Sequence, residues 1–211
     1  MGGHMVLAVS VWQSTCAMLL LACLSSFVWG MRRFFIRPAG SNTGMQITKI
    51  CGLLFSVLHF ALIVSQGDTP PAEGFAVTVL YVVATMLYAS SLFLFWWSVY
   101  TNRSKPLSAV FSPDLPMHFV SHGPYAWIRH PFYTSYLLTW LAGVVATGHL
   151  WLFSTVLVMV TIYWRAALLE EKKFFQTALA SLYAAYRTRT GLFAPSLVGL
   201  WMYFFRGFPL I

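Results

Sequence analysis

Long apolar blocks alternate with short polar connections along the whole chain. The blocks cover residues 6–29, 47–64, 75–100, 132–147 and 150–167. Most approach the ~20 residues that a helix needs to cross a hydrocarbon core of about 30 Å, and the short fourth block needs its flanks. The pattern predicts an all-α integral membrane protein, a bundle of about five transmembrane helices in which residues 1–211 form a single membrane domain.

The last two blocks are separated by Gly148 and His149 alone. Such a short connection predicts a tight helical hairpin, with the residues before the fourth block and after the fifth on one side of the membrane. Beyond the fifth block we expect one interfacial helix, closed by Gly191 and Pro195. Its apolar stripe consists of Phe174, Phe175, Leu179, Leu182 and Tyr186.

Composition and charge agree with a membrane protein. The chain is 59% hydrophobic and 9% charged, whereas roughly a quarter of the residues of a soluble domain are charged. The net charge of +8 comes from basic residues between the apolar blocks, where they face anionic lipid headgroups, so we expect membrane lipids as partners and no nucleic acid. The three cysteines have no metal-ligand spacing, and we predict no metal site.

The distribution of charge also predicts an orientation. With five spans, every Lys and Arg falls on one side, while the connection between the second and third blocks carries only Asp68 and Glu73. The positive-inside rule makes the basic side cytoplasmic. We therefore expect the N-terminus outside and the C-terminus in the cytoplasm.

A closely spaced polar and aromatic string precedes the fourth block. It consists of Gly123, Pro124 and Tyr125, followed by Arg129, His130, Pro131 and Tyr133. Pro131 suits the first turn of a helix, and the residue before a proline, His130, should be non-helical. Helix N-termini and Arg129 attract carboxylates, and the rings of Tyr125 and Tyr133 stabilise cations. At the end of a transmembrane helix, an arginine ordinarily sets the orientation and aromatic residues ordinarily lie at the membrane–water interface. The close spacing of all these residues favours a binding site instead.

A second cluster follows the fifth block. Its members are Arg165, Glu170, Glu171, Tyr183, Tyr186, Arg187, Arg189 and Pro195. A carboxylate pair beside the membrane is costly unless it is paired or solvated. The simpler interpretation is an interfacial helix with internal ion pairs, but the predicted hairpin brings this cluster to the same side as Arg129 and His130.

Together the two clusters resemble the isoprenylcysteine carboxyl methyltransferase family of integral membrane methyltransferases, over residues 117–195. The resemblance implies a cytoplasmic-side site for S-adenosylmethionine. It implies that the cofactor-binding residues are Gly123, Pro124, Tyr125, Arg129, His130, Pro131, Tyr133 and Glu171. Where the family has a histidine, this chain has Met117, with His118 one residue later, and the shifted spacing before Tyr183 leaves open which of Glu170 and Glu171 is functional.

The same residues suit methyl transfer on chemical grounds. The protein must bind a cationic sulfonium, align a nucleophile and exclude water. The candidate catalytic residues are Arg165, Glu170, Glu171 and His130. We expect an amphiphilic or lipid-like acceptor with a carboxylate, thiol or amine. The intramembrane His59 either lines the acceptor site or, as histidines more often do, bonds a neighbouring helix.

Two other functions remain open. Membrane sterol and steroid reductases, which use NADPH, share a similar Arg-His-Pro-x-Tyr element, and a non-enzymatic transport or assembly factor needs no site at all. The sequence has no Gly-x-Gly-x-x-Gly loop after a strand, which excludes a soluble Rossmann-type methyltransferase.

Overall fold

The computed structural model describes residues 2–36, 43–65, 75–103, 107–108, 115–116, 118–197 and 201. The α-helices are α1 (Gly2–Phe34), α2 (Thr43–Ser65), α3 (Phe75–Asn102), α4 (Pro131–Thr147), α5 (Phe153–Phe174) and α6 (Ala180–Arg189). Two 3-10 turns, η2 (Gly123–Ala126) and η3 (Leu150–Leu152), flank α4, and the two-residue strands β1 (Phe35–Ile36) and β2 (Leu107–Ser108) pair in parallel. The predicted all-α membrane fold is confirmed.

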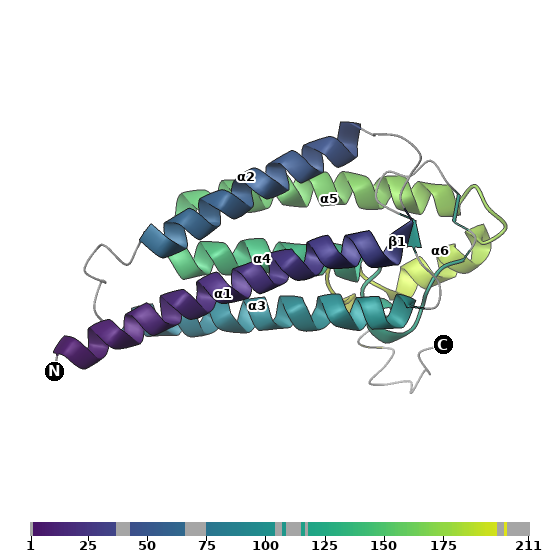
Figure 1. Ribbon diagram of the computed structural model, residues 1–211. Helices are drawn as coiled ribbons and strands as arrows, with labels where there is room; N and C mark the ends of the chain where they lie inside the picture. The colour runs from purple at the N-terminus through teal and green to yellow at the C-terminus, as the bar shows by residue number, and fades with distance from the viewer. Residues whose placement is uncertain are drawn as a thin grey trace.

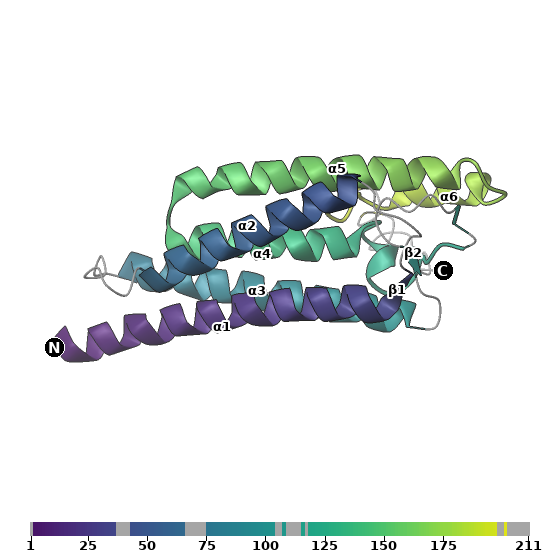
Figure 2. The ribbon, with the colours of Figure 1, turned by 45° about the horizontal axis from the view of Figure 1, so that its top comes forward.

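The long helices α1 to α5 lie side by side and alternate in direction, as Figures 1 and 2 show. The helices α1, α3 and α5 finish at the end of the bundle where α6 and both strands lie, and α2 and α4 begin there. Of the helices in the described part of the chain, four are long and apolar enough to cross a membrane. The fifth, α4, has only 17 residues, in agreement with the short fourth block.

The hairpin between α4 and η3 turns on a glycine. Gly148 caps α4 in the left-handed region with φ of 67°, and its N–H donates to the carbonyl of Val144 over 3.0 Å. Glycine adopts this conformation without the steric cost that a side chain brings. The predicted tight hairpin is confirmed, and it returns α5 to the end at which α4 begins.

The helix ends differ from the apolar blocks. The helix α1 continues to Phe34 and α5 to Phe174, because helical hydrogen bonding extends into polar residues that hydropathy alone leaves out. The predicted C-terminal helix is present as α6, but the predicted apolar stripe is wrong: the turn at 175–179 separates Phe174 in α5 from Leu182 in α6. Within α6, Tyr183 is buried while Leu182 is 60% exposed.

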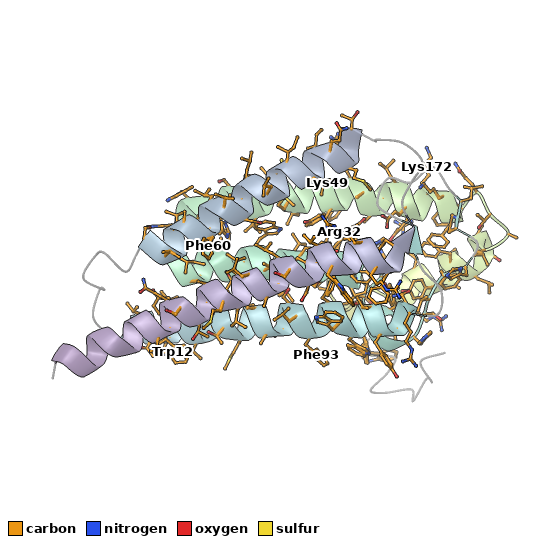
Figure 3. All side chains as sticks on the ribbon, in the orientation of Figure 1. Trp12, Arg32, Lys49, Phe60, Phe93 and Lys172 are labelled. Carbon is orange, nitrogen blue, oxygen red and sulfur yellow. The ribbon has the colours of Figure 1, made fainter. Side chains whose placement is uncertain are left out.

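The predicted gathering of basic residues is visible in Figure 3. Arg32, Lys49 and Lys172 lie toward the end that carries α6, whereas Trp12 and Phe60 lie toward the other end. The sidedness of the membrane stays a prediction.

His59 is buried and joins three helices near the hairpin end of the bundle. Its Nε2 lies 3.1 Å from Oγ1 of Thr155 in α5. A Cβ added to Gly143 of α4 would lie 2.0 Å from Nδ1 of His59, so the absence of a side chain at Gly143 makes room for the imidazole. The interpretation of His59 as a histidine bonded to a neighbouring helix is confirmed.

Candidate active site

The Gly-Pro-Tyr segment forms the turn η2 against the end of α3. Gly123 has φ of 61°, and a Cβ there would lie 2.6 Å from Oγ1 of Thr101. Both the conformation and the close approach require glycine. The phenol of Tyr125 accepts a hydrogen bond from Nδ2 of Asn102 over 2.8 Å, and its carbonyl accepts one from the hydroxyl of Tyr186 over 2.7 Å. The turn is therefore held by α3 on one side and by α6 on the other.

A backbone pairing joins the two predicted clusters. Ile128 forms an isolated parallel bridge with Gly191, and the N–H of Arg129 donates to the carbonyl of Gly191 over 2.8 Å. The N–H of His130 donates to the carbonyl of Leu192 over 3.2 Å. A side chain at Gly191 would meet the carbonyl oxygen of Ala194 at 1.7 Å. The segment after α6 therefore fixes the backbone of Arg129 and His130.

Glu171 is the centre of an ion-pair cluster. Its Oε1 lies 2.7 Å from Nε of Arg129 and its Oε2 lies 3.2 Å from Nε of Arg187. Nη1 of Arg129 donates to the carbonyls of Arg187 and Thr190. The Glu171 side chain is only 3% exposed, so its charge is compensated inside the protein, as a buried carboxylate requires. The structure thus brings the two predicted clusters together.

His130 lies between the two glutamates. Its Nδ1 is 3.5 Å from Oε2 of Glu170, and its Nε2 is 3.4 Å from Oε1 of Glu171. Burial by itself lowers the pKa of His130, but the neighbouring carboxylates outweigh burial and raise that pKa above its usual 6.5. His130 precedes α4 with φ of −124° and ψ of 64°, the non-helical conformation predicted for a residue before proline.

Glu170 is the more accessible carboxylate. Its side chain is 30% exposed, and its Oε1 accepts a hydrogen bond from the Tyr133 hydroxyl over 2.6 Å. The Tyr133 ring stacks on His130, with centroids 5.4 Å apart, and on Tyr163 of α5, with centroids 5.2 Å apart. Glu170 therefore borders a stack of aromatic rings, to which Tyr163 is an addition that neither sequence motif revealed.

Buried tyrosines complete the walls. Burial raises the pKa of Tyr125, Tyr183 and Tyr186 well above the usual value of 10, which keeps these phenols neutral. Tyr183 stacks face to face on Phe174, with centroids 4.3 Å apart. This contact folds α6 back onto the end of α5 and explains why the two tyrosines of α6 face the site.

Two candidate residues are placed differently. Arg165 is exposed on α5 and forms no ion pair with either glutamate, so its proposed role stays a prediction. His118 lies in the loop before η2, and its buried Nε2 has no hydrogen-bond partner among the described residues. Met117 lies outside the described residues.

The chemistry of the assembled side chains fits S-adenosylmethionine. The cofactor carries an ammonium, a carboxylate, a sulfonium and two ribose hydroxyls. The partly exposed carboxylate of Glu170 and the stacked ring of Tyr133 suit its positive groups. Arg187, whose side chain is 47% exposed, and His130, whose pKa is raised, are the basic groups beside Glu171. The residues present therefore match the ligand's charges in kind.

Comparison with known proteins agrees with this chemistry. Residues 79–182 match the phospholipid methyltransferase family. The matched segment, just under half of the chain, runs from α3 to the start of α6 and contains the first cluster together with Arg165, Glu170 and Glu171 of the second. The phospholipid methyltransferase family consists of integral membrane methyltransferases, so the match supports methyltransferase activity over the reductase alternative. No curated protein and no solved structure matches the chain.

Proposed function

We propose that the protein is an S-adenosylmethionine-dependent methyltransferase that acts on a membrane-embedded amphiphile at the cytoplasmic interface. The observation that carries the proposal is the meeting of Glu170 and Glu171 with Arg129 and His130 across the hairpin. These groups lie within the segment that matches a methyltransferase family. The narrower isoprenylcysteine carboxyl methyltransferase assignment is a prediction of the sequence motifs.

The two glutamates have different roles in this proposal. Glu171 is enclosed and engaged by two arginines, so it orders Arg129, Arg187 and His130. Glu170 keeps exposed surface and is held in place by the Tyr133 hydroxyl. We therefore assign ligand contact to Glu170 and positioning to Glu171.

The bound cofactor supplies an electrophilic methyl group on a sulfonium. The face of Tyr133 stabilises positive charge, and Arg187 and His130 attract the carboxylate of the cofactor. The turn at Gly123, Pro124 and Tyr125 closes the site from the side of α3 and keeps water away. These residues bind, orient and desolvate, which is most of what methyl transfer from a sulfonium demands.

Among the three acceptor classes, the site favours an amine. An acceptor carboxylate beside Glu170 would be repelled, whereas an ammonium is attracted by that carboxylate and by the tyrosine faces around it. The amine nitrogen must lose a proton before it attacks the methyl group. Bound S-adenosylmethionine would supply its methyl group to the lone pair of that nitrogen and would leave as S-adenosylhomocysteine. Glu170 takes the proton, because its side chain keeps exposed surface, whereas His130 is enclosed between the two glutamates.

The test is calorimetric titration of the detergent-purified protein with S-adenosylhomocysteine and, separately, with NADPH. The proposal predicts saturable binding of S-adenosylhomocysteine and none of NADPH. NADPH binding without S-adenosylhomocysteine binding would favour the reductase, and binding of neither would favour a non-enzymatic protein.

Matched variants connect binding to the site. We expect Arg129→Ala, His130→Ala and Glu171→Ala to lose S-adenosylhomocysteine binding. The control is Lys172→Ala, an exposed neighbour of Glu171 that forms no ion pair with a described residue. Retained binding in all three site variants would overturn the assignment of the site.

A further inference from the structure

Asn102 is the last residue of α3, and of the two polar atoms in its side-chain amide only the nitrogen forms hydrogen bonds with described residues. Its side chain is buried, with the residue only 4% exposed. Nδ2 donates to the carbonyl of Ser98 over 2.7 Å and to the Tyr125 hydroxyl over 2.8 Å. Because the carbonyl of Ser98 can only accept, this pairing fixes which amide atom is nitrogen. Oδ1 is left buried, with no donor among the described residues.

An unused buried acceptor is unusual in a folded protein. Buried side-chain oxygens nearly always accept a hydrogen bond, because burial removes their hydrogen bonds to water and leaving them unreplaced costs free energy. Such an atom therefore needs an explanation, and a ligand that completes the bonding is one. Asn102 is placed for such a contact, because its partner Tyr125 belongs to the turn that bridges α3 and α6.

The end of α3 packs against the turn η2, which borders the candidate site. Gly123 packs so closely on Thr101 that a Cβ would lie 2.6 Å from its Oγ1. Asn102 follows directly and reaches under the turn to the phenol of Tyr125. The carbonyl of Tyr125 accepts a hydrogen bond from Tyr186 of α6, and Arg187, the next residue of that helix, pairs with Glu171. Asn102 is therefore linked through the turn to the helix that contributes to the ion-pair cluster.

We propose that Oδ1 of Asn102 accepts a hydrogen bond from an N–H or O–H group of bound S-adenosylmethionine. The donors on that ligand are its adenine amino group, its ribose hydroxyls and its ammonium. The inference rests on the proposed function and adds a residue of α3 to a site that the sequence motifs confine to residues 117–195. Asn102 binds the ligand with Oδ1 and holds the Tyr125 ring with Nδ2.

The experiment compares S-adenosylhomocysteine affinities of purified variants by calorimetric titration. Asn102→Leu removes both amide functions and should weaken binding about 10-fold, the scale of one lost hydrogen bond in a buried site. Asn102→Asp keeps an acceptor but not the amide donor, and its affinity should lie between those of the wild type and Asn102→Leu. Ser98→Ala is the matched control, because that buried hydroxyl one turn earlier donates to the carbonyl of Leu94 in its own helix, and binding should not change.

Tyr125→Phe separates direct contact from positioning, since it removes the partner of Nδ2 and leaves Oδ1 in place. Direct contact predicts a smaller loss of affinity for Tyr125→Phe than for Asn102→Leu. Equal losses in these two variants, wild-type affinity in Asn102→Leu, or weaker binding by Asn102→Asp than by Asn102→Leu would each overturn the inference. If Asn102→Leu does not fold, Asn102→Asp is compared with Tyr125→Phe, and weaker binding by the aspartate variant overturns it. Absence of binding by the wild type would overturn the proposed function itself.

Discussion

Nε of Arg129 donates to Oε1 of Glu171 over 2.7 Å, joining the loop before α4 to the last turn of α5. The second oxygen of the same carboxylate lies 3.2 Å from Nε of Arg187 in α6. One side chain thus connects the three segments that carry the site. Arg129 lies 42 positions before Glu171 in the sequence and Arg187 lies 16 positions after it, yet both contact its carboxylate.

Removing this carboxylate should destabilise the fold. Glu171→Gln leaves two arginines beside a buried neutral group, and breaking a buried ion pair from one side costs about 3–5 kcal/mol. We expect a lower midpoint of thermal unfolding in detergent, with Lys172→Ala as the unchanged control. An unfolding midpoint for Glu171→Gln equal to that of the wild type would show that the cluster does not organise the structure.

The neighbouring carboxylate should matter to turnover instead. Glu170→Gln keeps the size of the side chain and the acceptor for the Tyr133 hydroxyl, but it cannot take a proton. Loss of a general base typically lowers the rate about 100-fold or more. We expect this loss in kcat at saturating cofactor, with an unfolding midpoint close to that of the wild type. Unchanged kcat would remove Glu170 from the proton transfer.

The protonation of His130 predicts how stability varies with pH. Its folded-state pKa is raised, so its stabilising contribution is fully present below the unfolded value near 6.5 and is lost as pH rises through the folded pKa. The stability difference between the wild type and His130→Ala should therefore shrink as pH rises above about 6.5. Unfolding midpoints at a series of pH values measure it. A difference that grows with pH would contradict the pairing of His130 with the glutamates.

Gly143 offers a test of packing inside the bundle. Gly143→Ala would place a Cβ 2.0 Å from Nδ1 of His59, and overpacking of this kind costs roughly 1–3 kcal/mol. Gly52→Ala in α2 is the matched control, because a Cβ there meets nothing within 4 Å. We expect a lower unfolding midpoint for Gly143→Ala and an equal or higher one for Gly52→Ala. Equal midpoints for both variants would show that His59 moves aside without cost.

The arrangement of the helices could be predicted because the membrane constrains both the length of each apolar block and the side on which the basic residues lie. Gly148 marked the hairpin, and the hairpin in turn predicted that Arg129 would lie near Glu171. The break at 175–179 could not be predicted, since apolar spacing does not distinguish one helix from two joined by a turn. Phe174 supports that turn by stacking on Tyr183, a contact made only after the chain has folded back.

Contacts between distant segments account for what the sequence left open. Nothing local separates Glu170 from Glu171; only their partners do, an aromatic hydroxyl for one and two arginines for the other. The bridge of Ile128 to Gly191 was missed as well. Gly191 was its one local signal, and it was interpreted as the end of a helix.

The most direct test of the account is transfer of tritium from S-[methyl-³H]adenosylmethionine to vesicles that contain an amine-bearing lipid. The account predicts that the wild type labels the lipid, that labelling falls about 100-fold in Glu170→Gln, and that vesicles whose lipid amine is acetylated stay unlabelled. No label above background with the wild type, or equal labelling by the wild type and Glu170→Gln, would contradict it.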